Sequence, residues 1–220
     1  MTNDPENRGK KKLFDNPVLE LLTKSSPTVI LGTYLPLIGA MIFYAYYQGY
    51  VEGVQQGLIW FGAALLTWTF FEYILHRFLF HLMEDHPKYH RVYYMLHGIH
   101  HDFPRDPNRL FMPPVAGLTL AFIFYVVFYL TIGTKVYIFL PGFVMGYVMY
   151  TMVHYSMHRF KPPRFLEPLW RHHHLHHYKY SEKGFGVSSM IWDHVFRTMP
   201  PEQKKTKKTG VKVGSDNKAA

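Results

Sequence analysis

The sequence predicts an all-α integral membrane protein made of two helical hairpins, with a polar, histidine-rich helical cap on one side of the membrane. Three observations support this fold class. Four apolar stretches are each long enough to cross a bilayer core, which takes about 20 helical residues. Very short loops join the first stretch to the second and the third to the fourth. Ten of the 15 histidines fall into four clusters just beyond the ends of these stretches.

The chain begins with an N-terminal arm, residues 1–27, in which a short helix is expected over Asn16–Lys24. Asn16 is a favourable N-cap residue, and Pro17 suits the first helical turn. Because this helix has an apolar face, it either lies in the plane of the membrane interface or serves as a simple linker. The apolar face consists of Val18, Leu19, Leu21 and Leu22.

Four membrane spans are expected in the apolar part of the chain, and a long polar stretch separates the second from the third. The spans are Thr28–Tyr47, Gly57–Leu75, Pro114–Ile132 and Val136–Val153. We expect residues 28–200 to form one membrane domain and residues 201–220 to form a basic, disordered tail.

Lysine and arginine predict the orientation. Of the 24 such residues, only Lys135 lies in a hairpin loop, so the positive-inside rule places both termini and the cap in the cytoplasm. The net charge of +9 comes largely from the two ends of the chain, where basic clusters beside membrane spans commonly contact anionic headgroups. No surface with interleaved basic and stacking residues is found, so a nucleic-acid partner is not expected.

The histidine clusters have the spacing of metal ligands. They read His76-x4-His81, His97-x2-His100-His101, His154-x3-His158 and His173-x2-His176-His177. Residues three and four apart share a helix face, so each triplet is expected to converge on one point. His76 and His81 are five apart and diverge by about 140° on a straight helix, which requires a local distortion or a wide gap between the metals.

The composition restricts the chemistry of this centre. The chain has no cysteine, which excludes a Cys-ligated haem, Fe–S cluster or zinc site, and ten imidazoles suit two metal ions better than one. An all-imidazole dinuclear site suits non-haem iron, which activates dioxygen and permits attack on unactivated C–H bonds. Zinc fits the same ligands but has no redox chemistry. A centre at the membrane interface indicates a lipid substrate that enters from the bilayer.

The non-enzymatic alternative is a His-rich metal transporter, which should hold its ligands near the membrane midplane.

Several further residues are candidates for roles around the ligands. Glu72 lies one helical turn before His76, where a carboxylate either orients the imidazole or forms a salt bridge with Arg77 or another cap residue. Weaker candidates are Asp102, Asp193, Tyr150 and Tyr155. The run GFGV at 184–187 is expected to allow a tight bend. The histidines outside the clusters are expected at the surface or around the ligands; these are His86, His90, His172, His174 and His194.

Four segments resemble the fatty acid 2-hydroxylase family, in the wider fatty acid hydroxylase and sterol desaturase superfamily. They are EYILHRFLFH (72–81), HGIHHDFPRDPNRLFMPP (97–114), GYVMYTMVHYSMH (146–158) and HHLHHYKYSEKGFGVSSMIWDHVF (173–196). The histidine spacings match the superfamily, and the blocks HRFLFH, RLFMPP and GFGV point to the 2-hydroxylase branch. The resemblance extends over residues 13–200.

The resemblance implies an enzyme that inserts one oxygen atom from O2 at C2 of a fatty acid or of a sphingolipid acyl chain. It implies two iron ions, with zinc possible in purified protein. The implied ligands are His76, His81, His97, His100, His101, His154, His158, His173, His176 and His177. An alternative within the superfamily is a sterol or carotenoid hydroxylase or desaturase.

The chain also departs from the family pattern. It resembles the form without a cytochrome b5 domain, so its electrons are expected from a separate donor: a cytochrome b5, a ferredoxin or a flavoprotein. This compact form favours a bacterial inner membrane over the endoplasmic reticulum. Thr151 and Arg159 stand where relatives often have Asp and His, so the surroundings of the ligands are expected to differ from the family pattern while the ligand set stays the same.

Overall fold

The computed structural model describes residues 12–81 and 87–201, and these residues form helices and loops without a β-strand. The all-α prediction is therefore confirmed for this part of the chain. The main helices are α1 (Pro17–Leu22), α2 (Pro27–Tyr47), α3 (Gly53–Ile74), α6 (Pro114–Ile132), α7 (Val136–Arg159), α8 (Glu167–Tyr178) and α9 (Ile191–Val195). Residues 1–11 of the predicted arm, His86, and residues 202–220 of the predicted tail lie outside the described residues.

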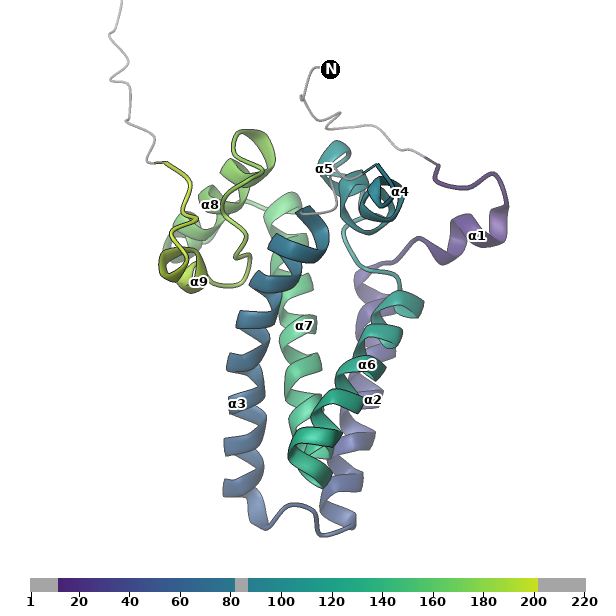
Figure 1. Cartoon of the computed structure of the whole chain (residues 1–220), viewed down its shortest axis with the longest axis vertical. Coiled ribbons are helices and arrows are strands. Elements are labelled where there is room, and N and C mark those ends of the chain that lie inside the picture. The colour runs from purple at the N-terminus through teal and green to yellow at the C-terminus, as the bar shows by residue number, and fades with distance from the viewer. Residues whose placement is uncertain (1–11, 82–86, 202–220) are drawn as a thin grey trace, which may run out of the picture.

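Three helical stretches are long and apolar enough to cross a membrane: Pro27–Tyr47, Gly53–His81 and Pro114–Arg159. The third has 46 residues, which as one straight helix would measure about 69 Å, twice the thickness of a bilayer core. It is not straight. The chain turns at η3 (Gly133–Lys135), where Gly133 adopts φ +58°, and α6 and α7 lie side by side (Figure 1).

Helix α7 is the central element of the bundle, since it packs against α2, α3 and α6. Its contact with α3 depends on two glycines four residues apart, the spacing that lets two membrane helices approach closely. A Cβ at Gly142 would lie 2.5 Å from the carbonyl oxygen of Phe61, and one at Gly146 would lie 2.5 Å from Cβ of Trp68. The small residues therefore bring α3, which leads into His76 and His81, into direct contact with α7, which carries His154 and His158.

The short helix α1 begins as predicted, with the Asn16 side chain accepting hydrogen bonds from the backbone N–H groups of Val18 and Leu19. Its buried residue, Glu20, accepts a hydrogen bond from Arg109 at 2.5 Å. This ion pair ties α1 to the segment before α6. The apolar side chains of α1 remain exposed; they are Val18, Leu19, Leu21 and Leu22.

The cap lies at one end of the bundle, with α8 and α9 on the side of α3, and α4 and α5 on the side of α2 and α6 (Figure 1). It consists of α8, α9 and a helical segment before α6 that contains α4 (His90–Tyr93), η2 (Tyr94–Gly98) and α5 (Ile99–Asp102). Segments distant in sequence therefore meet where the bundle ends.

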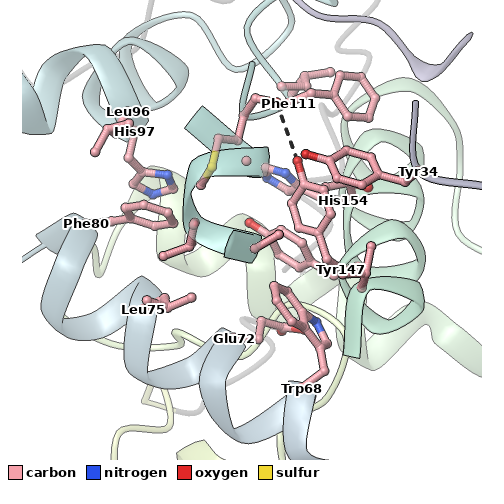
Figure 2. Close-up of a pocket in the computed structure, with 18 of the residues that line it drawn as sticks. Tyr34, Trp68, Glu72, Leu75, Phe80, Leu96, His97, Phe111, Tyr147 and His154 are labelled. Carbon is pink, nitrogen blue, oxygen red and sulfur yellow. Dashed lines mark hydrogen bonds between the residues drawn. The ribbon is translucent and has the colours of Figure 1, made fainter. Parts of the chain in front are cut away.

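A largely apolar cavity lies inside the bundle where it meets the cap (Figure 2). Side chains from α3, α6 and α7 form its walls, among them Trp68, Phe124, Phe143 and Tyr147. At its cap end it is lined by His97, His100 and His154. The cavity therefore connects the membrane helices with the histidine clusters.

Candidate metal centre

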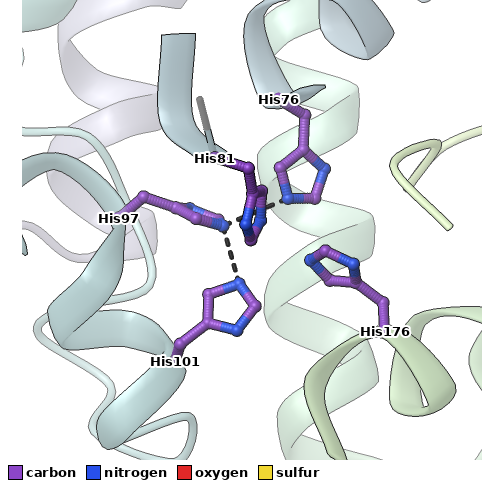
Figure 3. A group of neighbouring side chains, drawn as sticks. All are labelled: His76, His81, His97, His101 and His176. Atoms are coloured by element: carbon purple, nitrogen blue, oxygen red, sulfur yellow. Dashed lines mark hydrogen bonds between the residues drawn. The ribbon is translucent and has the colours of Figure 1, made fainter. Parts of the chain in front are cut away.

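The ten cluster histidines assemble into two groups, each with five ring nitrogens that all lie within 4.8 Å of one another. Site 1 consists of His76, His81, His97, His101 and His176 (Figure 3). Site 2 consists of His100, His154, His158, His173 and His177. Every site 2 histidine is buried, and in site 1 only His81 and His101 are partly exposed.

The expectation that each triplet converges on one point is wrong. In the first triplet His97 and His101 belong to site 1, whereas His100 belongs to site 2. In the second, His176 belongs to site 1, and its two companions belong to site 2. On a helix, the side chains at i and i+4 point in directions about 40° apart, whereas the side chain at i+3 points about 60° to the other side of i. A triplet at i, i+3 and i+4 that lies between two ions can therefore supply ligands to both.

The awkward five-residue spacing of His76 and His81 is resolved by a local distortion, as the sequence required. Residues Leu75–His81 form a π-helix, η1, which continues α3. Because π-helical hydrogen bonds join residues five apart, His76 and His81 come to the same side, with ring centroids 5.1 Å apart.

The arrangement of the ring nitrogens fits metal ions. Within site 1, Nε2 of His97 lies 3.1 Å from Nε2 of His76 and 2.8 Å from Nε2 of His101. Within site 2, Nε2 of His158 lies 2.9 Å from Nε2 of His173. Two ligands at right angles on an ion with 2.1 Å bonds are about 3.0 Å apart, so these separations match neighbouring ligands of one ion.

The electrostatics favour the same reading. Burial, reinforced by the neighbouring histidines, holds the pKa of each cap histidine in the two sites well below its usual range; these are His97, His100, His101, His173, His176 and His177. The imidazoles are therefore neutral at pH 7, which is the form that binds metal.

The two sites are adjacent. The ring of His101 in site 1 stacks on the ring of His177 in site 2, with centroids 4.3 Å apart and planes 23° apart. The histidine set is thus consistent with a dinuclear centre.

The loop of residues 183–188 holds two histidines of site 1. The carbonyl oxygen of Phe185 lies 2.5 Å from Nδ1 of His76, and that of Lys183 lies 2.7 Å from Nδ1 of His176. A carbonyl oxygen can only accept, so each Nδ1 is the protonated nitrogen. Each ring then has its Nε2 lone pair available for a metal, the usual arrangement around metal-binding histidines.

Two buried carboxylates hold this loop in place. Glu72 accepts hydrogen bonds from the backbone N–H groups of Val187 and Ser188, at 2.7 and 2.8 Å, and from the Ser188 hydroxyl. Asp193, fully buried, accepts from the N–H groups of Phe185 and Gly186, at 3.0 and 2.7 Å. Glu72 thus contacts the loop and not an imidazole. Its link to His76 is indirect, through the loop whose Phe185 carbonyl oxygen contacts Nδ1 of His76.

The glycines of the GFGV run are required for this loop. Gly184 adopts φ +76°, as the expected tight bend requires. A Cβ at Gly186 would lie 2.0 Å from the carbonyl oxygen of Ser189 and 2.8 Å from Oδ2 of Asp193. Only glycine leaves room for this approach of the loop to the carboxylate.

The other candidates lie in different places. Tyr150 stacks on the ring of His154, with planes 13° apart, and lines the cavity. Tyr155 packs against Phe111. Asp102 is exposed and accepts a hydrogen bond from Tyr94 at 2.9 Å.

Among the remaining histidines, His172 is buried and lies 3.1 Å from Oδ2 of Asp193, so it belongs to the network that supports the loop. His174 is partly buried, and His90 and His194 are exposed. Sequence reasoning did not connect Asp193 or His172 with a specific ligand. In the sequence, the sign of this supporting network was the GFGV run beside the histidine clusters, since two glycines so close together indicate a constrained loop.

Comparisons with known proteins agree with this geometry. Residues 61–198 match the family model described as fatty acid hydroxylase. A dihydroceramide fatty acyl 2-hydroxylase of Arabidopsis thaliana is 34% identical over 203 residues, which cover 90% of this chain and 84% of the plant protein. A fatty acid 2-hydroxylase of Mus musculus is 40% identical over 158 residues, covering 69% of this chain but only 42% of the mouse protein.

A solved structure of full-length scs7p, in which only the hydroxylase domain is visible, is similar in fold. The TM-score is 0.82 at 34% sequence identity, and the match covers 90% of this chain and 76% of that chain. Fold, paired histidine groups and sequence thus agree: the chain belongs to the fatty acid hydroxylase family.

Proposed function

We propose that this chain is a membrane-bound 2-hydroxylase that inserts one oxygen atom from O2 at C2 of a fatty acid or of a sphingolipid acyl chain. The observation that carries the proposal is the apolar cavity, which runs from the histidines of both sites into the helical bundle. The names of the relatives, a dihydroceramide fatty acyl 2-hydroxylase and a fatty acid 2-hydroxylase, support the position of attack.

The proposed topology has four spans. Helices α6 and α7, with 19 and 24 residues, are each long enough to cross the bilayer core separately. Both hairpins then begin and end at the cap, and the distribution of lysine and arginine places the cap in the cytoplasm. The ten histidines would lie at one end of the spans, which argues against a transporter with ligands at the midplane.

The cavity walls suit an acyl chain. Most of the lining is aromatic or aliphatic, including Trp68, Phe124 and Phe143, which suits a methylene chain, and Glu72 and Arg109 add charged groups to it. His97 of site 1 and His100 and His154 of site 2 line the same cavity, so a chain that occupies it brings a C–H bond beside both sites. Positioning of this kind accounts for a large part of the catalytic effect of many enzymes.

We propose that the ten histidines hold two iron ions, with zinc able to replace them in purified protein. Bound iron would supply the activation of dioxygen, which no side chain of this chain can perform. One oxygen atom enters the C–H bond, and the other leaves as water after two electrons and two protons are consumed. The electrons would come from a separate donor protein: a cytochrome b5, a ferredoxin or a flavoprotein.

The test is mass spectrometry of acid-hydrolysed fatty acids from cells that express the chain, beside a His100→Ala variant whose expression is verified. We expect 2-hydroxy fatty acids in the parent alone. If the parent makes none, each donor class is co-expressed in turn. Unchanged acyl chains with every donor, together with altered sterols or carotenoids, would refute C2 hydroxylation in favour of the other chemistry of the superfamily.

A further inference from the structure

The two sites differ in what holds their histidines. In site 1, Nδ1 of His76 and of His176 each lie within hydrogen-bonding distance of a backbone carbonyl oxygen of the 183–188 loop. In site 2, the Nδ1 atoms of three of the five histidines are buried and have no hydrogen-bond partner among the residues that the structure describes. These three are His100, His173 and His177, whereas His154 contacts the backbone of Leu110.

This difference affects metal binding for a physical reason. An imidazole whose Nδ1–H is held by an acceptor is locked in one tautomer and one orientation, and its Nε2 becomes more basic. A ring without such an acceptor can carry its proton on either nitrogen, and metal binding must select the correct form. Loss of a partner of this kind typically lowers metal affinity by about 10- to 100-fold.

The loop is itself firmly held. Glu72 and Asp193 together accept four hydrogen bonds from the backbone N–H groups of Phe185, Gly186, Val187 and Ser188. Asp193 also contacts His172 at 3.1 Å and accepts from Thr198 at 2.7 Å. The carbonyl groups that hold the site 1 histidines are thus fixed by carboxylates that themselves touch no ligand.

We propose that site 1 binds its metal ion more tightly than site 2, and that Glu72 and Asp193 maintain this difference as positioning residues through the 183–188 loop. This goes beyond the proposed function, because it holds whatever the lipid substrate is. Its measurement is the metal content of the protein and does not depend on activity.

The first experiment follows metal release. The full chain, purified in detergent with two equivalents of metal, is mixed with EDTA, and retained metal is measured by mass spectrometry over time. We expect two phases of one equivalent each, with rates at least about tenfold apart. His173→Ala should keep only the slow phase, and His176→Ala only the fast one. Equal rates in the parent, or the reverse assignment in the two variants, would overturn the proposal.

The second experiment tests the carboxylates. In Asp193→Asn, an amide NH2 replaces one of the two carboxylate oxygens that accept hydrogen bonds from the loop. We expect the slow phase to accelerate by about tenfold or more while the fast phase is unchanged. Ser188→Ala removes only the hydroxyl that contacts Glu72 and should accelerate the slow phase less; it also serves if the Asp193 variant does not fold. Glu182→Gln, a change of an exposed carboxylate beside the loop, is the control and should leave both phases as in the parent. A slow phase that none of these variants alters would exclude the carboxylates.

Discussion

Replacing Gly142 with alanine should loosen the contact between α3 and α7. The new Cβ would lie 2.5 Å from the backbone carbonyl oxygen of Phe61 and 2.9 Å from Cβ of Ala64. Ordinary contact begins near 3.4 Å, so the two helices must separate locally by about 0.9 Å, the difference between 3.4 and 2.5 Å. A backbone atom cannot rotate away as a side chain can, so the strain reaches the helix axes. Overpacking of this kind costs about 1–3 kcal/mol.

The separation should also affect the metal centre. Helix α3 leads into His76 and His81, whereas α7 carries His154 and His158, so a shift between the helices displaces ligands of site 1 relative to site 2. We therefore expect lower metal content as well as a lower unfolding temperature for Gly142→Ala.

Thermal unfolding of the detergent-purified protein, followed by tryptophan fluorescence, measures the loss of stability. Gly62→Ala is the matched control, because Gly62 lies in the same pair of helices and a Cβ there meets nothing within 4 Å. The control should be neutral or slightly stabilising, since alanine favours helix over glycine by about 1 kcal/mol. If Gly142→Ala unfolds at the same temperature as Gly62→Ala, the close approach of α3 and α7 inferred from the structure is refuted.

Three further predictions concern the pH response, the N-terminal helix and the cavity. The pKa values of the buried cap histidines lie well below 6.5. The metal-free protein should therefore be fully stable above pH 6.5 and lose stability as the pH falls, because the unfolded chain then binds more protons than the folded chain. An unfolding temperature that stays constant from pH 8 to pH 5 would contradict this prediction. Glu20→Gln removes the negative charge from the buried ion pair with Arg109 and should lower the free energy of unfolding by about 3 kcal/mol in chemical denaturation, whereas Asp15→Asn at an exposed position should change it little. Ala121→Trp adds a large side chain to the cavity wall from α6, a helix that carries none of the ten histidines. It should reduce the yield of 2-hydroxy fatty acids by about tenfold or more with metal content unchanged, and an unreduced yield would place the acyl chain elsewhere.

Much of the architecture follows from local sequence patterns. Apolar stretches of bilayer length, Asn16 before Pro17, and the short loop at Gly133–Lys135 each act within a few residues, so they predicted the long helices and the start of α1. The histidine spacings identified ten candidate ligands for the same reason. Helix α7 continues to Arg159, beyond the expected end of the membrane span at Val153, and so carries His154 and His158 on the same helix.

The sequence by itself determined that ten histidines would gather at one end of a helical bundle and that they suit two metal ions. Only the tertiary structure decided which histidines share an ion, because the triplets lie between two sites. Their allocation depends on how the histidine rings of η2, α5 and α8 meet those of η1 and α7. The role of Glu72 was decided in the same way. A carboxylate one turn from His76 looks like its direct partner in sequence, but the loop that it holds comes from residues 187 and 188, more than a hundred positions away. Contacts between such distant segments depend on packing, which no local pattern encodes.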